Sequence, residues 1–209
     1  MAKFKTRLIE SDTSISNKIS AEINRQFITK LPQAMNEIIR SYKPILKSAL
    51  FKNETVQSIM GGKLRGELGI TNSLGKLNNI INTLINNISF KISKRGNKTI
   101  IALTIVEEDF LRLTNLSSAL QNTQKGGQFN WLDWLLFKGD AVVVHGYEVV
   151  PSNSRASRTG LAIMINFGRK GFSVDPSHSG TQFDNFITRS IKTTEDDLLK
   201  IIEQKLNGT

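Results

Sequence analysis

The 209-residue sequence has no cysteine and only two histidines. Without a thiol the chain cannot form a disulfide, a Cys-ligated zinc site, an iron–sulfur cluster or a thiolate nucleophile. The imidazoles of His145 and His178 have no further metal-ligating residue at a helical or hairpin spacing, which disfavours a histidine metal site. We therefore expect no cofactor and no metal, and these counts point away from an enzyme.

Long apolar runs are also missing. The most apolar stretches, residues 100–106 and 141–144, are far shorter than the roughly 18 residues of a membrane span. Residues 1–10 carry three basic side chains but are followed by no apolar segment typical of a secretory signal. The sequence therefore predicts no membrane partner and a protein that stays in the cytoplasm in which it is made.

Positive charge is plentiful but uneven. The formal net charge is +10, and residues 1–100 hold 17 basic and 6 acidic side chains, whereas residues 101–209 hold 11 and 12. A basic half can bind nucleic-acid phosphates, dock on an acidic protein surface, or simply keep the chain soluble. Most of these cations are spaced singly, and the one cluster is our candidate DNA-facing set, which consists of Lys91, Lys94, Arg95 and Lys98.

Helical periodicity dominates residues 1–86. Apolar residues recur every three or four positions, which is typical of amphipathic helices. Pro32 suits the first turn of a helix, and Pro44 is expected to kink or end that helix. The predicted helices cover residues 13–30, 32–50, 54–60, 64–68 and 74–85.

Residues 87–209 alternate apolar and polar side chains in several places, which indicates strands. The sequence predicts a hairpin from residues 88–92 and 99–106 around Gly96-Asn97, and a second strand pair from residues 141–150 and 161–166. Between the two pairs lies a long connection, residues 107–130, with a short helix near residues 110–116.

A long helix is predicted at the C-terminus. Thr181 and Asp184 match a capping box, and one apolar face follows, formed by Phe183, Ile187, Ile191, Leu198, Ile202 and Leu206. The expected fold is α+β, with N-terminal helices, an antiparallel sheet of about four strands, and the C-terminal helix packed on the sheet. A basic helical region, 1–86, and a sheet region, 87–209, are expected to form one compact unit.

No segment of the sequence carries a specific signature of catalysis or ligand binding. Residues 61–66 (GGKLRG) lack the preceding strand and the final GK[ST] of a phosphate-binding loop. The carboxylates of residues 107–109 (EED) suit a metal site in a nuclease, but acidic residues also favour a helix start. Ser157 and Ser179 lack the G-x-S-x-G turn of a serine hydrolase.

Two surfaces are candidates for assembly. Trp131, Trp134 and Phe137 lie in one short aromatic segment, which we interpret as core combined with an oligomer interface, although such aromatics can also stack on bases. Arg155 and Arg158 lie in the polar loop of residues 151–160, and we expect them to be exposed and to contribute to docking.

Four short segments occur in a recognisable order: residues 64–70 (LRGELGI), 131–137 (WLDWLLF) with Gly139, 157–160 (SRTG) and 179–191 (SGTQFDNFITRSI). Their order resembles the neck or tail-completion (head–tail joining) proteins of long-tailed bacteriophages, particularly contractile-tailed ones. The resemblance extends over about residues 55–206.

The resemblance implies a structural virion protein rather than an enzyme, made in the host cytoplasm and located in the neck or tail region. It implies an α+β subunit that forms a homo-oligomeric ring, commonly a hexamer. Its partners would be head connector or portal-side proteins on one side, tail terminator, tube or sheath proteins on the other, and genomic DNA in the lumen.

Two other functions remain open from the residues alone. A nucleic-acid-binding protein would hold phosphates with the basic half and stack bases on Trp131 and Trp134. A nuclease would use residues 107–109 and require a metal. Tight, salt-dependent binding of short DNA or RNA would favour the first alternative, and metal-dependent cleavage the second.

Overall fold

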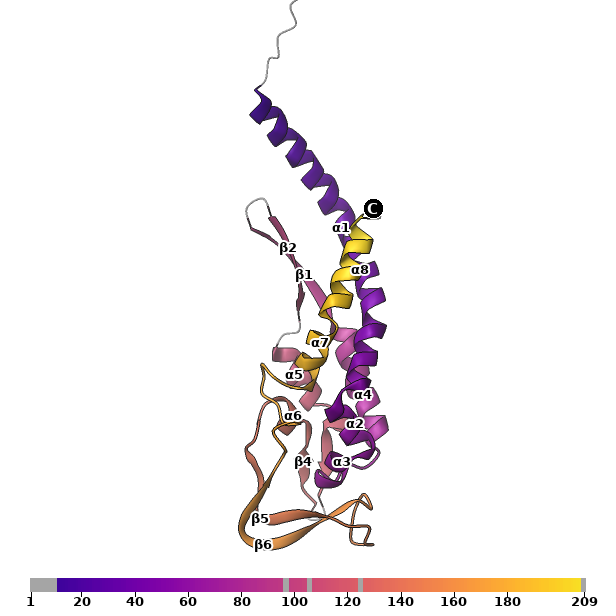
Figure 1. Ribbon diagram of the computed structural model, residues 1–209, viewed down its shortest axis with the longest axis vertical. Coiled ribbons are helices and arrows are strands. Elements are labelled where there is room, and N and C mark those ends of the chain that lie inside the picture. The colour runs from indigo at the N-terminus through magenta and orange to yellow at the C-terminus, as the bar shows by residue number, and fades with distance from the viewer. Residues whose placement is uncertain (1–10, 96–97, 105–106, 124–125, 208–209) are drawn as a thin grey trace, which may run out of the picture.

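The computed structural model describes residues 11–95, 98–104, 107–123 and 126–207 (Figure 1). Its longest element is α1 (Asp12–Lys52), one continuous helix of 41 residues. The expected start of a second helix at Pro32 and the expected helix end at Pro44 are therefore wrong, because both prolines lie inside α1. An interior proline costs a helix about 3 kcal/mol, but a stripe of fully or nearly fully buried side chains continues past both of them: Leu31, Met35, Ile38, Tyr42, Leu46 and Leu50.

The remaining N-terminal helices lie close to their expected positions. They are α2 (Glu54–Gly61), α3 (Lys63–Glu67) and α4 (Ser73–Asn87). Gly69 ends the α3 turn with φ +63°, a conformation that favours glycine. The apolar side of α4 is buried against the core, whereas Leu74, which the periodicity places on that side, is half exposed.

The strands pair as separate antiparallel hairpins rather than as one four-stranded sheet, so that part of the predicted fold is wrong. The described strands are β1 (Ser89–Arg95) with β2 (Lys98–Thr104), β3 (Leu120–Asn122) with β4 (Gln128–Asn130), and β5 (Val142–Pro151) with β6 (Ala162–Ser173). The short β3–β4 pair was missed because each strand has only three residues, two of which are Gln or Asn. The fold class is mixed α+β, as expected.

Between the hairpins lie α5 (Glu107–Thr114), the 3₁₀ turn η1 (Ser117–Ala119) and α6 (Leu132–Leu136). The predicted helix in the long connection corresponds to α5. Gln121, part of the polar stretch in this connection, is buried, and its Oε1 accepts hydrogen bonds from the backbone N–H and hydroxyl of Thr71 and from Lys76 Nζ. This amide therefore ties β3 to the start of α4.

The C-terminal helix is broken into α7 (Phe186–Thr193) and α8 (Glu195–Asn207). Both pack on α1 rather than on a sheet, with α8 running alongside it (Figure 1). The contact includes a buried hydrogen bond of 2.8 Å between the hydroxyls of Tyr42 and Thr194 and an ion pair of 3.2 Å between Lys205 and Glu37. The expected packing of this helix on the sheet is wrong, since α1 covers its apolar side.

The capping residue of α7 is Asn185, not Thr181. The Asn185 side chain accepts hydrogen bonds from the backbone N–H groups of Ile187 and Thr188, and the Thr188 hydroxyl accepts one from Asn185 N–H. Thr181 instead closes a turn with Asp184 just before the helix. Phe183 therefore lies outside the helix and is 86% exposed, not part of the buried face.

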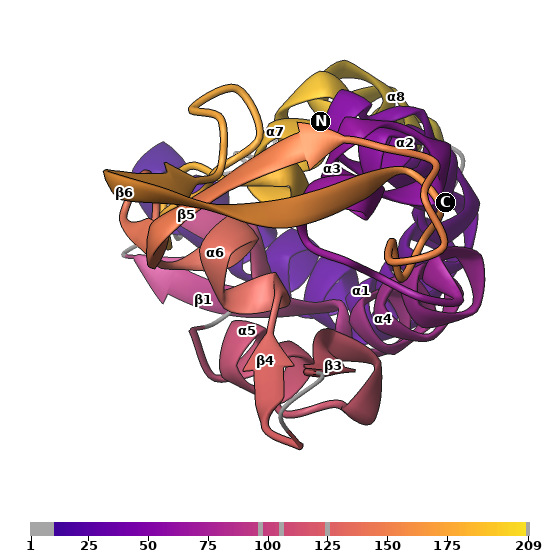
Figure 2. The same ribbon diagram turned by 90° about the horizontal axis from the view of Figure 1, so that it is seen from below.

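One apolar core extends from Leu31 on α1 to Ile201 on α8 and includes residues from both predicted regions. The molecule is elongated. The N-terminal part of α1 projects beyond this core at one end, and the β5–β6 ribbon lies across the other (Figures 1 and 2).

Candidate assembly surfaces

The aromatic segment is more buried than an open interface would be. Trp131 is fully buried, and its indole Nε1 donates a 3.1 Å hydrogen bond to the Ser118 carbonyl. Trp134 and Phe137 are half buried. Lys138 Nζ lies 5.7 Å from the centre of the Trp134 ring, and Phe137 meets Phe110 edge to face. Trp131 is thus a core residue, and only Trp134 and Phe137 retain surface that a partner can reach.

This segment holds the loop that precedes α7. Gly180 N–H donates a hydrogen bond to the Trp134 carbonyl, and Gly139 N–H donates one to the Gly180 carbonyl. A Cβ atom at Gly180 would collide with the Leu135 carbonyl oxygen, so only glycine fits there. The sequence segments 131–137 and 179–191, far apart in the chain, form one structural unit.

The other two segments of the resemblance also meet. A Cβ atom at Gly66 on α3 would lie 3.0 Å from Leu161 Cβ and 3.2 Å from Ala162 Cβ at the start of β6. The guanidinium of Arg158 lies over Gly69, with Nη1 3.1 Å from where a Cβ would be. The structure therefore pairs segment 64–70 with segment 157–160 and the residues just after it.

The arginine loop is exposed, with its shape set by serine side chains. The Ser157 hydroxyl donates to the Ala162 carbonyl at 2.6 Å and accepts from the N–H of Leu161. Arg155 and Arg158 are exposed, and within the described part of the chain neither has an ion-pair partner. Burial, and secondarily the charge of Arg158, lowers the pKa of Lys76 below its usual range. The loop therefore presents unpaired positive charge.

The candidate DNA-facing cations lie on the first hairpin. Lys91, Lys94 and Arg95 are on β1 and Lys98 is on β2, with Arg95 paired to Lys98. The directions of their side chains lie outside what the structure describes.

The remaining sequence motifs form the ends or first turns of helices. Residues 61–66 end α2 and form α3, and residues 107–109 form the first turn of α5. Among the described residues there is no group of three or more histidine or acidic side chains that could hold a metal ion. No helix in the described ranges is long and apolar enough to cross a bilayer.

Two features of the surface were missed by the sequence analysis. The first is the Phe183 loop, residues 175–185, with Arg189 at its base. Arg189 Nε donates to Asp184 Oδ1 at 2.7 Å, and its other nitrogens donate to the carbonyls of Ser177 and Ser179. The hydrogen bonds from Arg189 to the Asp184 carboxylate hold the pKa of that carboxyl below its usual range. A capping pattern N-x-x-T at residues 185–188 could have placed the helix start after Phe183.

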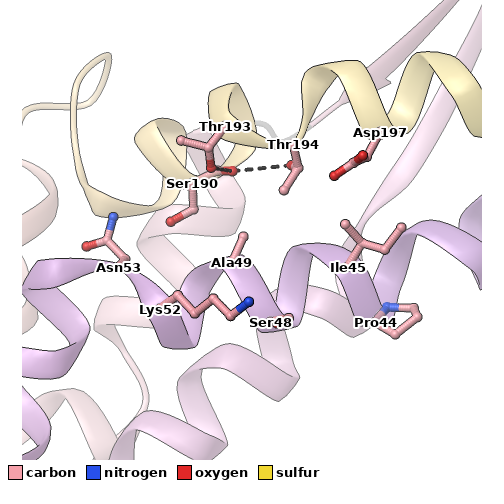
Figure 3. Close-up of a pocket in the computed structure, with 10 residues that line it drawn as sticks. All are labelled: Pro44, Ile45, Ser48, Ala49, Lys52, Asn53, Ser190, Thr193, Thr194 and Asp197. Atoms are coloured by element: carbon pink, nitrogen blue, oxygen red, sulfur yellow. Dashed lines mark hydrogen bonds between the residues drawn. The ribbon is translucent and has the colours of Figure 1, made fainter.

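The second is a groove of about 590 Å³ between α1 and the α7–α8 segment (Figure 3). On the α1 side it is lined by Pro44, Ile45 and Ala49, with Lys52 toward one end. Hydroxyl side chains of α7 and the carboxylate of Asp197 line the opposite side. Because it is built by two elements 130 residues or more apart, no local pattern predicts it.

Comparison with known proteins adds no relative: no family model matches the chain, and no curated protein or solved structure matches it.

Proposed function

We propose that this protein is a structural component of a tailed-phage virion, a neck or tail-completion subunit whose ring joins the DNA-filled head to the tail. One observation carries the proposal. The four segments that resemble such proteins come together as two contacting pairs, one around Gly66 and Gly69 and the other around Gly180.

Several exposed features suit a subunit that assembles with copies of itself and with neighbouring rings. The arginine loop carries unpaired cations, and the N-terminal part of α1 exposes Ile19 and Ile23 beyond the core. The β5–β6 ribbon has no further strand paired to either edge among the described residues. Many repeated contacts of moderate strength close a ring more effectively than a single pocket does. In this proposal the ring is a hexamer in the virion neck, with connector proteins above it, tail proteins below it and no membrane partner.

The test is genetic and structural. Lysates of a phage that lacks the protein should contain DNA-filled heads and finished tails that remain unjoined, counted by negative-stain electron microscopy. Adding the purified protein should restore joined particles without ATP or added metal. Normal joined particles in its absence would rule the proposal out.

A subsidiary part of the proposal concerns DNA in the neck. Lys91, Lys94, Arg95 and Lys98 would face the DNA that has entered the ring. Reversing these four charges should then leave joining intact but cause heads to leak DNA, measured as nuclease-sensitive DNA. As a control, reversing two exposed cations elsewhere, Arg40 of α1 and Lys200 of α8, should cause no leakage.

A nucleic-acid-binding function is the second candidate, because α1 carries seven basic and three acidic residues. It predicts tight binding of short duplex or single-stranded DNA that weakens steeply between about 50 and 200 mM salt. The neck proposal predicts weak binding over that range. Fluorescence anisotropy with a labelled 20-mer separates the two.

A further inference from the structure

Phe183 is the most exposed large apolar side chain that the structure describes, at 86% exposure. Large aromatic side chains on a surface are the usual anchors of protein–protein contacts. This one is presented by the Phe183 loop between β6 and α7, which in Figure 2 bulges away from the helices. A partner that covers the ring would remove this apolar surface from water.

The Phe183 loop is held in place before any partner arrives. Arg189 donates hydrogen bonds to both Asp184 carboxylate oxygens and to two loop carbonyls. Gly180 is bonded to α6, and the Asn185 side-chain amide donates to the Thr181 carbonyl at 2.9 Å. A loop ordered in this way loses little conformational entropy when its anchor is buried, which favours binding.

The groove between α1 and the α7–α8 segment has the complementary properties (Figure 3). Its volume of about 590 Å³ accommodates an aromatic ring, and Pro44, Ile45 and Ala49 give it an apolar side. Lys52 is exposed at one end and has no ion-pair partner within the described residues. The groove thus has an apolar side on α1 and hydroxyls opposite, with the positive charge of Lys52 at one end and the carboxylate of Asp197 at the other.

The charges of the Phe183 loop indicate which partner segment fits the groove. Asp175 and Asp184 lie at the two ends of the Phe183 loop and are exposed, and local hydrogen bonds lower the pKa of both, so they are ionised at neutral pH. The aromatic ring next to Asp184, whose exposed carboxylate also pairs with Arg189, matches an apolar recess next to a lysine. The loop and the groove belong to the same chain, so the partner that fits the groove is a second copy.

We infer that Phe183 of one copy inserts into the groove between α1 and α7–α8 of the next copy, with Lys52 of the receiving copy facing the Asp184 carboxylate. The loop and the groove are different surfaces, so the contact is heterologous and leads from copy to copy. Such a contact closes a ring when the rotation between copies closes. The inference rests on the proposed function in naming the partner, and it specifies how the ring is held together.

Two variants test the two sides separately. Phe183→Ala removes the anchor, and Ala49→Trp fills the groove. Mass photometry and sedimentation velocity should show oligomers for the wild-type chain and at least a tenfold weaker association for each variant. Lys52→Glu, on an exposed side chain, tests the groove without risk to the core and should also weaken association. Leu74→Ala, which removes a half-exposed side chain on α4, is the matched control and should leave association unchanged.

Mixing gives the decisive result. The Phe183→Ala chain keeps a working groove and the Ala49→Trp chain keeps a working anchor. An equimolar mixture should therefore form dimers with one chain of each kind, but nothing larger. Because the chain contains no cysteine, Phe183→Cys and Ala49→Cys chains can also be joined by a short bismaleimide, and a Leu74→Cys chain should not be joined to the Ala49→Cys chain.

Several outcomes would overturn the inference: a wild-type chain that stays monomeric at 100 µM, unchanged association of Phe183→Ala, or a mixture that forms no dimer. Loss of association in Leu74→Ala alone would place the interface on α4 instead. The head–tail joining assay distinguishes the two proposals. Assembly through Phe183 together with normal joining in its absence would refute the neck function alone.

Discussion

Asn185 shows how one side chain can organise a helix start. It is fully buried, accepts two backbone N–H groups of α7 and donates to the Thr181 carbonyl. The Thr181 hydroxyl, in contrast, is exposed and accepts one N–H within a turn. The number of bonds and the burial both favour Asn185 as the residue on which the helix depends.

Asn185→Ala should lower the free energy of unfolding by about 2 kcal/mol, because it removes the cap and leaves buried backbone groups without partners. Thr181→Ala, the matched control, should cost less than about 1 kcal/mol. Urea unfolding followed by circular dichroism measures both. Equal losses for the two variants would contradict the assignment of the cap.

Tyr42 provides a pH-dependent test. Burial raises the pKa of its phenol above the ordinary value of about 10, and the hydroxyl bonds with Thr194. A raised pKa in the folded state means that the neutral phenol contributes stability fully below about pH 10, and that this contribution is lost as the pH rises through the folded-state pKa.

Tyr42→Phe should therefore lower stability by about 1 kcal/mol at pH 7, through the lost hydrogen bond. The difference in unfolding free energy between the two proteins should shrink as the pH is raised from 9 to 11. Only the wild-type chain has a phenol at this position, and its ionisation after unfolding exposes it favours the unfolded state. Thermal unfolding at several pH values measures this. A difference that stays constant with pH would show that the phenol is not buried in the folded state.

At the scale of elements, α1 divides into two parts with different roles. Between residues 11 and 30 the described side chains are exposed or half exposed, and Ile19 and Ile23 lie at 55% and 62% exposure. From Leu31 onward the apolar stripe is buried against α4, α7 and α8. Packing of the second part explains why the helix continues through two prolines, whereas the first part is helical without cover.

A pair of substitutions in this one helix tests the division. Leu46→Ala should lower the free energy of unfolding by about 2–5 kcal/mol, because it opens a cavity in the core. Ile23→Ala should change it by no more than about 0.5 kcal/mol, because the side chain is exposed in the monomer. Both are measured by urea unfolding at a concentration where the chain is monomeric. A large loss for Ile23→Ala would mean that the projecting part is packed on something.

At the scale of the whole molecule, the surfaces proposed for assembly are spread along its length. The arginine loop connects the two strands of the ribbon at one end, the projecting part of α1 lies at the other, and the groove lies between α1 and the C-terminal helices (Figures 1 and 3). A subunit of a ring that joins two larger bodies needs distinct surfaces for its copies and for each neighbour.

Replacing Arg155 and Arg158 together with serine tests the loop at this scale. Both are exposed and without described ion-pair partners. The free energy of unfolding, measured by thermal unfolding, should therefore change by less than about 0.5 kcal/mol. The number of joined particles in the complementation assay should fall. A marked loss of folding stability would instead assign these arginines to the fold.

Much of the local structure is determined by the sequence alone. The periodicity of residues 54–85 predicts α2, α3 and α4, and alternation predicts β1 with β2 and β5 with β6, because side-chain spacing reports which side of an element is apolar. The absence of cysteine excludes thiol chemistry without any structure. Of the candidate site, the sequence marks the aromatic segment and the arginine loop.

Only the tertiary structure decides what covers each apolar side. Burial of its stripe carries α1 through Pro32 and Pro44, whose local effect alone predicts a break. The hairpins do not join into one sheet, and β5–β6 packs against α3 instead. Phe183 falls outside α7 because Asn185 caps the start of that helix. The groove requires α1 to meet α7 and α8 across more than 130 residues. Periodicity is a local property, whereas burial depends on long-range contacts that no short segment encodes.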